Sequence, residues 1–274
     1  MKKIAVIGLG LIGTSLLKAL QGKGYELVGI SQNPETIKKA LDQKLVSEAS
    51  VDFALLKDAD IVFIATPIDT VCAIIDTVTT TVTQEAIVAD LASVKGFILD
   101  YVNQNTSLNF IGLHPMAGTE NKGFDSAEDR LFENSKWAVV PSDFAKRESI
   151  ELIENLIREI GAKPMRTDAK SHDKAVAIVS HLPMLLSQAL FVSASDDTSK
   201  TLAASGFRDM TRLAMSNSDM ARDMVKFNKE NIQEALNTVD FAVKKLLENY
   251  QSEDIESIAK QRREMYSKDG KNKF

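Results

Sequence analysis

Short apolar runs alternate with amphipathic stretches over the first half of the chain. The runs are rich in Val, Ile and Phe: KKIAVIGL, ELVGIS, DIVFIAT, EAIVAD and NFIGLH. Continuous apolar runs of this length are typical of strands buried on both faces of a parallel sheet. Between them, LIGTSLLKALQGKG, PETIKKALDQK and IDTVCAIIDTVTTTV carry apolar residues at helical spacing. This alternation predicts an α/β fold with a doubly wound, Rossmann-type sheet.

The pattern changes after Lys163. No strand-like run follows, and long helical patterns take over, among them DMARDMVKFNKENIQEALNTVDFAVKKLLENYQ. A change in the type of element is a candidate domain boundary. We therefore expect a domain over residues 1–165 and an all-helical domain over residues 166–274.

Composition narrows the class of protein. At 274 residues, with 44% hydrophobic and 26% charged residues, the chain is long enough for two domains with real cores. The net charge is -5, and basic and acidic residues are interspersed along the sequence. Because there is no cluster of basic residues of the kind that binds phosphate backbones, we expect no nucleic-acid partner. Cys72 is the sole cysteine, which excludes an internal disulfide and fits the reducing cytosol. We expect a cytoplasmic protein.

Two segments could be mistaken for membrane or export sequences. MKKIAVIGLGLIG begins with lysines and an apolar stretch, but glycines interrupt it and no cleavage-like site follows. Residues 175–195, AVAIVSHLPMLLSQALFVSAS, have no formal charge and almost the length of a membrane span. Their several serines, glutamine, histidine and proline favour a helix buried at the centre of the helical domain. We expect neither export nor a membrane span.

A glycine motif follows the first predicted strand and opens a helix. GLGLIG spans Gly8 to Gly13, with Leu11 and Ile12 in the first helical turn. Gly8 permits the tight turn, Gly10 lets a pyrophosphate approach the backbone, and Gly13 lets helix and strand pack closely. The helix N-terminus then faces the phosphates. The motif predicts binding of NAD or NADP.

The choice between the two dinucleotides depends on the end of the second strand. NAD enzymes usually place a carboxylate there to bind the ribose 2′-hydroxyl. Here ELVGIS ends in Ser31, followed by Gln32 and Asn33, and the nearby cations are Lys38 and Lys39. Without a carboxylate to repel a 2′-phosphate, the sequence favours NADP or dual use, and NAD stays an alternative.

Polar and turn-forming residues follow the predicted strands at their carboxyl ends, the edge where open α/β sheets bind ligands. They are Thr66, Pro67, Ser93, Lys95, His114 and Glu120. His114 stands in LHPMAGTE, where Pro115 and Gly118 shape a loop. A histidine held by a hydrogen bond in a turn is the alternative, but the neighbouring cofactor site favours a role in catalysis.

Several motifs together resemble the prephenate and arogenate dehydrogenases of tyrosine biosynthesis. GLGLIG, SVKG, HPMAGTE, SHLP and SGFRDMTR occur in this order, and the resemblance runs from Ile4 to about Leu247. HPMAGTE and SHLP carry most of its specificity. The resemblance implies a nucleotide-binding domain followed by an all-helical domain that forms a homodimer.

The same resemblance implies an oxidative decarboxylation with hydride transfer to NAD or NADP. Prephenate would give 4-hydroxyphenylpyruvate, and aromatisation of the ring would drive the reaction. His114 matches the family histidine that neutralises the charge developing on the substrate hydroxyl as hydride leaves. A neutral imidazole can do this near pH 7. Ser93 matches a serine near that hydroxyl and the nicotinamide ribose. Arogenate stays an alternative, although RDMVKFNKEN looks more like the prephenate branch.

Further residues are implied in substrate binding. Arg212 matches the family arginine for a substrate carboxylate, with Asp209 to position it and Arg208 as a second candidate. Arginines four residues apart share one face of a helix. His181 of SHLP matches a histidine of the substrate pocket, and Glu120 would gate the site or pair with the arginines.

Other functions are less well supported. The histidines at 114, 172 and 181 lack metal-ligand spacing, so we expect no metal, and we interpret His172, at a helix start, as structural. A different two-domain hydroxyacid or imine oxidoreductase would lack SHLP and the paired arginines. A non-catalytic nucleotide sensor would have no use for the convergence of His114, Ser93 and Arg212.

Overall fold

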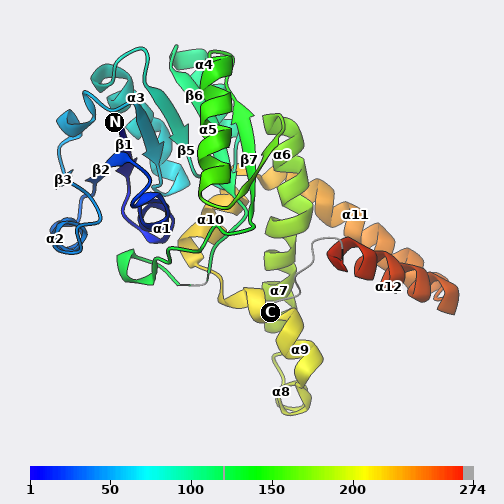
Figure 1. Ribbon diagram of the computed structural model, residues 1–274. Helices are drawn as coiled ribbons and strands as arrows, with labels where there is room; N and C mark the ends of the chain where they lie inside the picture. Colours follow the sequence, from blue (N-terminus) through cyan, green and yellow to red (C-terminus); the bar gives the residue numbers. More distant parts are fainter. Residues whose placement is uncertain (120, 268–274) are drawn as a thin grey trace. The chain divides into compact units, whose positions relative to one another are not determined.

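One mixed sheet forms the first part of the computed structural model, which describes residues 1–119 and 121–267 (Figure 1). Its eight strands lie in the order β3-β2-β1-β4-β5-β6-β7-β8. They are β1 (Lys2–Ile7), β2 (Tyr25–Ile30), β3 (Glu48–Ser50), β4 (Ile61–Ile64), β5 (Ile87–Asp90), β6 (Asn109–Pro115), β7 (Lys136–Pro141) and β8 (Lys163–Arg166). Neighbours are parallel except β6 and β7, which are antiparallel. The predicted doubly wound sheet is confirmed.

Helices cover both faces of this sheet. They are α1 (Leu11–Leu20), α2 (Pro34–Asp42), α3 (Ile68–Thr81), α4 (Gly96–Asn105) and α5 (Arg147–Glu159), with short 3-10 turns η1 (Phe53–Leu56) and η2 (Phe124–Ser126). Alternate residues of β1 enter different cores: Ile4 packs with α1 and α5, whereas Ala5 packs with α3 and α4. This two-sided burial explains why the strands are continuous apolar runs.

Three strands were not predicted, and two of them, β3 and β8, lack an apolar run. β3 is short and partly exposed, and β8, KPMR, is an edge strand with little burial. β7, KWAVVP, pairs antiparallel with β6 and is buried in only part of its length. β8 ends at Arg166, and the regular elements described after it are helices.

Helices make up the rest of the described chain. A continuous helix consists of α6 (Ala169–Val176), a π-helical segment, η3 (Ala177–His181), and α7 (Leu182–Ser193). It is followed by α8 (Asp197–Leu202), α9 (Ser205–Met210), the 3-10 turn η4 (Arg212–Met215), α10 (Ser218–Phe227), α11 (Lys229–Glu248) and α12 (Ser252–Ser267). By contacts, residues from Met1 to Ile232 form one compact unit, and a second unit begins at Gln233.

The helix Ala169–Ser193 is the one described helix that is long and apolar enough to cross a membrane, with a mean hydropathy of 1.8 in its most apolar window. The sequence led us to expect this helix to be buried. Within the single chain, only 33% of that window is buried, and Phe191 and Val192 are 57% and 70% exposed. Its outer face is therefore apolar and uncovered in the chain on its own.

Candidate active site

The turn from β1 into α1 has the geometry that the glycine motif predicts. Gly8 has a φ of 97°, and a Cβ there would lie 2.7 Å from the Ala65 carbonyl oxygen. A Cβ at Gly13 would lie 2.0 Å from the Gly8 carbonyl oxygen. Side chains are therefore excluded at both positions, and β1, β4 and α1 approach one another closely. β1 and β4 are neighbours at the point where the strand order reverses, the usual ligand site of such sheets.

The N-terminus of α1 is open to a ligand. Its N-cap is Gly10, which offers no side-chain hydrogen bond, and no atom of residues 1–119 or 121–267 outside its chain neighbours lies within 4 Å of a Cβ built on that residue. Leu11 and Ile12 form the first helical turn and are half-buried. The first N–H groups of a helix have no intrahelical acceptor, and they favour an anion. These residues fit the pyrophosphate of a dinucleotide.

The neighbouring strand ends carry hydroxyl groups and no carboxylate. The Ser31 hydroxyl, after β2, accepts a hydrogen bond from the Asn33 backbone N–H at 3.2 Å. The Asn33 side chain caps α2 by accepting from the Glu35 N–H at 2.9 Å. After β4, the Thr66 hydroxyl accepts from the Thr70 hydroxyl at 3.0 Å, and Pro67 is the N-cap of α3. This edge would accommodate the ribose of either dinucleotide.

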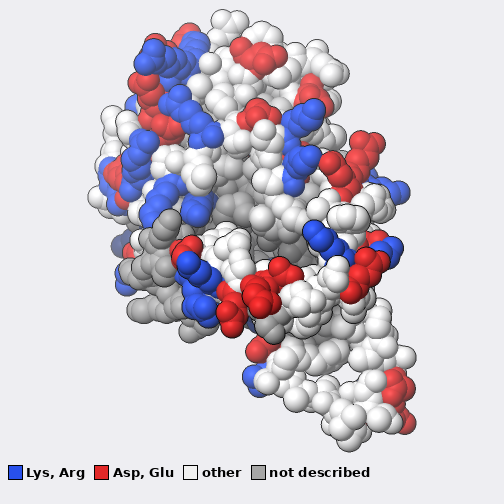
Figure 2. Space-filling model, turned by 90° about the vertical axis from the view of Figure 1, so that its right-hand side faces the viewer, with Lys and Arg blue, Asp and Glu red and all other residues white. Residues whose placement is uncertain are grey.

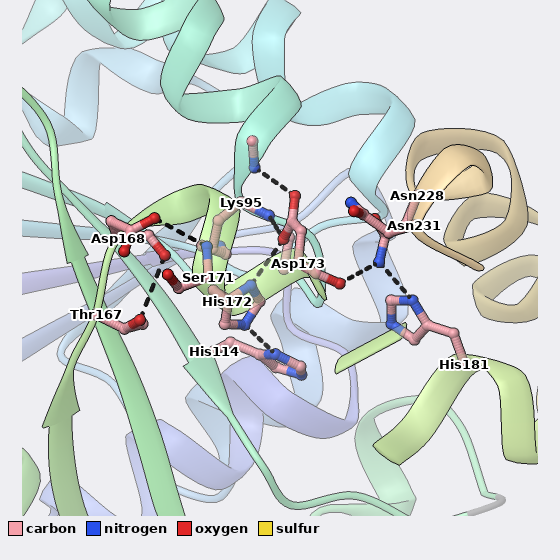
Figure 3. Close-up of polar contacts among 12 residues, drawn as sticks. Lys95, His114, Thr167, Asp168, Ser171, His172, Asp173, His181, Asn228 and Asn231 are labelled. Atoms are coloured by element: carbon pink, nitrogen blue, oxygen red, sulfur yellow. Dashed lines mark hydrogen bonds and ion pairs between the residues drawn. The ribbon is translucent and has the colours of Figure 1, made fainter. Parts of the chain in front are cut away.

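A buried chain of polar contacts begins at the carboxyl end of β6 (Figure 3). His114, which is 8% exposed, places its Nδ1 atom 2.9 Å from Nε2 of His172. The other ring nitrogen of His172, Nδ1, lies 2.7 Å from Oδ1 of Asp173. His172 and Asp173 are 4% and 5% exposed and belong to α6. The end of the sheet is thus joined to the first helix after it.

Asp173 also holds the loop that carries Ser93. Its Oδ1 accepts a hydrogen bond from the Lys95 backbone N–H at 2.8 Å, and its Oδ2 accepts from the Gly96 N–H at 2.7 Å. The ammonium group of Lys95 is itself paired with Asp90 at the end of β5, and both side chains are fully buried. Ser93 lies within this loop and is half-buried. The loop that carries Ser93 is therefore fixed by the two hydrogen bonds from the Lys95 and Gly96 backbone N–H groups to Asp173.

Asn228 connects this chain of contacts to His181. The Asn228 amide nitrogen donates to the Asp173 backbone oxygen at 2.8 Å and lies 3.1 Å from Nδ1 of His181. Its oxygen accepts from the Asn231 amide at 2.7 Å. His181 is fully buried, and its Nε2 atom has no hydrogen-bond partner among the residues that the structure describes. A buried nitrogen without a partner is costly, so it marks a position for a ligand atom.

Burial keeps the imidazole rings of His114 and His181, at the two ends of this chain of contacts, neutral. Desolvation holds the pKa of His114 well below its usual value, and the charges of His172, Lys95 and His181 lower that pKa further. Desolvation also lowers the pKa of His181 to about 4, although Asp173 opposes the shift. Near pH 7, each ring has one N–H and one lone pair. His114 can therefore accept a proton there.

The predicted substrate residues are only partly brought together. His114, His181 and the Ser93 loop are linked by the contacts above, whereas Arg208, Asp209 and Arg212 are exposed and outside them. Arg208 Nε lies 3.6 Å from Asp209 Oδ1, so these two neighbouring residues form an ion pair.

The predicted shared helical face of Arg208 and Arg212 is wrong. α9 ends at Met210, and Arg212 begins the separate 3-10 turn η4. The chain turns at Thr211, which has a φ of -103° and a ψ of 7°. Glu120, the remaining predicted substrate residue, lies outside the described residues.

Sequence reasoning missed three members of the site. Asp173 and Asn228 were not singled out, and the interpretation of His172 as structural did not include its direct contact with His114. The adjacent pair His172-Asp173 lies in the polar stretch KSHDK of α6, so the sequence pattern did not distinguish it from an exposed start of a helix. Asn228 gave little indication, because it sits within a helical pattern that the structure divides into α10 and α11. Among residues 1–119 and 121–267, no cluster of His, Cys, Asp and Glu is placed to hold a metal ion.

Fold and site together define a class of protein. An open glycine turn at the switch point of a doubly wound sheet, with a neutral imidazole at the same sheet edge, is the arrangement of a dinucleotide-dependent oxidoreductase. Residues 16–166 match the family described as prephenate dehydrogenase, nucleotide-binding domain, and residues 168–264 match the prephenate dehydrogenase, dimerization domain. The chain belongs to the prephenate dehydrogenase family.

Known relatives agree with this assignment. A prephenate dehydrogenase of Lactococcus lactis subsp. cremoris is 34% identical over 84% of this chain and 66% of its own length. The crystal structure of Synechocystis arogenate dehydrogenase is 33% identical, with a TM-score of 0.85, and the match covers 97% of this chain and 99% of that one. Prephenate dehydrogenase from A. aeolicus, in complex with hydroxyphenyl propionate and NAD+, is 28% identical, with a TM-score of 0.85 over 98% and 97% of the two chains.

Proposed function

We propose that this protein is a prephenate dehydrogenase, which converts prephenate to 4-hydroxyphenylpyruvate and carbon dioxide with hydride transfer to NAD+ or NADP+. The observation that carries the proposal is the neutral, buried imidazole of His114 at the sheet edge that also holds the open glycine turn. The relatives named for this reaction support it. The reaction would place the protein in tyrosine biosynthesis.

The chain's own residues account for the proton and for the positions of the groups. The pyrophosphate would lie against Gly10 and the start of α1, in the turn that Gly8 and Gly13 make possible, and the bound nicotinamide would accept the hydride. His114 would take the proton of the substrate hydroxyl as hydride leaves the same carbon. Ser93 would hydrogen-bond that oxygen. Carbon dioxide then departs as the ring becomes aromatic.

His181 suits the substrate side of the pocket. Because the Asn228 amide nitrogen donates to Nδ1 of His181, the proton of this neutral ring belongs on Nε2. The free Nε2–H would donate to a substrate carboxylate or carbonyl oxygen. We assign the other carboxylate contacts to Arg212, with Arg208 as a second candidate and Asp209 and Glu120 in supporting roles.

Arogenate is a second candidate substrate, favoured by the similarity to Synechocystis arogenate dehydrogenase. The two substrates differ by an amino group in place of a keto group, away from the hydroxyl that His114 would contact. For the cofactor, the absence of a carboxylate after β2 favours NADP or dual use, with NAD as the alternative.

We further propose that the helical part, from residue 166 onward, pairs with a second copy in a homodimer. The family description of residues 168–264 as a dimerization domain supports this. So do the apolar residues exposed on α7 and α8, among them Phe191, Val192 and Leu202. Covering them would bury the outer face of the long apolar helix without a membrane. We place the enzyme in the cytoplasm, where its sole cysteine would stay reduced.

The direct test combines each substrate with each cofactor. Purified protein is mixed with prephenate or arogenate and with NAD+ or NADP+, and the absorbance of the reduced nicotinamide is followed. Turnover with prephenate, faster than with arogenate, is expected. Turnover with arogenate alone would move the assignment to the second candidate, and no turnover in any of the four mixtures would contradict the enzyme assignment.

A further inference from the structure

The direction of each hydrogen bond in the buried chain of contacts follows from Asp173. Both of its oxygens accept backbone N–H groups, from Lys95 and Gly96, so the side chain acts as a carboxylate acceptor. Nδ1 of His172, 2.7 Å from Oδ1, must therefore carry a proton and donate it. A neutral His172 then has its lone pair on Nε2.

The next contact is fixed in turn. In that neutral form, Nε2 of His172 can only accept, so Nδ1 of His114, 2.9 Å away, is the donor. The proton of neutral His114 is then held on Nδ1, and its lone pair is on Nε2. Both bonds are within the normal range for N–H donors, and the three residues are each at most 8% exposed, so water does not compete for these contacts.

We propose that His172 and Asp173 are positioning residues that hold the proton of His114 on Nδ1 and so keep Nε2 of His114 available as the base. The inference rests on the proposed role of His114. In the opposite tautomer, Nε2 would carry the proton and could not accept one from a substrate hydroxyl. An aspartate that fixes the tautomer of a catalytic histidine does the same in serine proteases, and here a second imidazole is interposed.

The surrounding charges are consistent with this arrangement. Lys95 faces the site from the loop after β5, but its ammonium group is paired with Asp90, and His181 approaches from the π-helical segment as a neutral ring. The Asp173 carboxylate is the charged group that is hydrogen-bonded to the His172 ring. A positive charge that develops on His114 during the reaction would be stabilised through His172 by that carboxylate.

The state of the rings can be measured in the protein without cofactor or substrate. The chain has three histidines, so protein labelled with 15N in the imidazole rings gives three ring systems in a long-range proton–nitrogen NMR spectrum. We expect two rings protonated on Nδ1, those of His114 and His172, and one on Nε2, that of His181. The variant His114→Asn lacks one system and thereby assigns it. A His114 ring protonated on Nε2 would overturn the proposal.

Two amide variants separate positioning from mere structural support. The amide of His172→Gln reaches the place of Nε2 and offers His114 an acceptor, whereas the amide of His172→Asn reaches the place of Nδ1 and preserves the donor to Asp173. We expect His172→Gln to keep turnover within a few-fold and His172→Asn to lose about tenfold to a hundredfold in kcat, within the usual worth of general-base catalysis. Cofactor affinity should be the same in both, and only His172→Asn should shift the tautomer of His114.

The opposite order contradicts the proposal. If His172 served only to hold Asp173 and the Ser93 loop, His172→Asn would be the better tolerated variant and the tautomer of His114 would not change. If neither variant folds, the spectrum of the unaltered protein decides. A protein that turns over no substrate but shows His114 protonated on Nδ1 would defeat the proposed function and leave the positioning intact, so the two failures are distinguishable.

Discussion

At the scale of single residues, the site depends on imidazoles that are kept neutral by burial. A charged ring in this environment would lose its hydration without a full counter-charge, so the lowered pKa values of His114 and His181 follow from desolvation. A neutral His114 is a competent base at neutral pH and below, which fits its proposed role. The same burial makes the stability of the protein depend on pH.

We predict that the free energy of unfolding falls as the pH is lowered from about 6.5 to about 4. Histidines of the unfolded chain bind protons below about pH 6.5, whereas folded His181 does so only near its pKa of about 4. The unfolded state therefore binds more protons in this window, and stability is lost as pH falls. At about 1.4 kcal/mol per pKa unit, His181 contributes up to about 3 kcal/mol, and His114 acts in the same direction.

Urea unfolding of the intact protein and of His181→Phe, each at several pH values, checks this prediction. Carboxylates titrate in the same window, but they are common to both proteins and cancel in the difference. The loss between pH 6.5 and pH 4 should be smaller in the variant, by up to about 3 kcal/mol. Parallel curves for the two proteins would show that His181 is not the source.

At the scale of elements, two glycines in the turn from β1 to α1 serve different purposes: one is required for packing and the other leaves space for a ligand. Gly13 is required by the fold, because a Cβ would strike the Gly8 carbonyl oxygen at 2.0 Å. In the described part of the chain, Gly10 has no neighbour within 4 Å of such a Cβ, and its φ of -84° suits any residue. The empty space at Gly10 is where a pyrophosphate would approach.

The variants Gly10→Ala and Gly13→Ala form a matched pair for this distinction. Without cofactor, Gly10→Ala should unfold within about 0.5 kcal/mol of the unaltered protein, whereas Gly13→Ala should lose about 1–3 kcal/mol or more from overpacking. Dinucleotide binding by Gly10→Ala, followed by titration calorimetry, should weaken at least about tenfold, or 1.4 kcal/mol. Unchanged binding would mean that the phosphates do not lie against Gly10.

The break between α10 and α11 is an element whose importance is not visible in the pattern. Apolar residues recur at helical spacing through this region, which indicates one long helix. The structure interrupts it at Asn228, with a φ of -127° and a ψ of 25°, and the side chain there joins Asp173 to His181. The interruption thus supplies a member of the site, which periodicity alone does not indicate.

At the scale of the whole molecule, the surface has a region rich in charged side chains and a region that is mostly uncharged (Figure 2). Figure 2 shows basic and acidic side chains interspersed over most of one face, and a mostly uncharged surface at its lower end, where α8 and α9 lie in Figure 1. Leu202 and Val192 are 75% and 70% exposed in this part of the chain. Such a concentration of exposed apolar side chains is characteristic of an interaction surface.

We predict that Val192→Asp and Leu202→Asp disrupt the proposed homodimer, because each buries a charge in an apolar interface. Light scattering coupled to size-exclusion chromatography should give the mass of two chains for the unaltered protein and a shift toward one chain for both variants. Phe144→Asp, at a 44% exposed phenylalanine before α5, is the matched control and should leave the mass unchanged. A single-chain mass for the unaltered protein would contradict the proposed dimer.

The sequence by itself determined the architecture. Apolar runs of β1, β2, β4, β5 and β6, buried on both faces, leave a pattern that no other fold class produces as readily, and the glycine motif is local enough to be recognised from its spacing. His114 and Ser93 could be placed near a cofactor because strand ends of a parallel sheet meet at one edge.

Only the tertiary structure decided how His114 is supported. His114 and His172 are 58 positions apart, and Asp173 and Asn228 are 55 apart, so no local pattern relates them. Hydrogen bonds between buried side chains depend on positions and directions that arise when α6 packs against α4, and α10 packs against α3 and the π-helical segment. Sequence periodicity reports which face of an element is buried, whereas the direction of a buried hydrogen bond is fixed by the atoms that surround it.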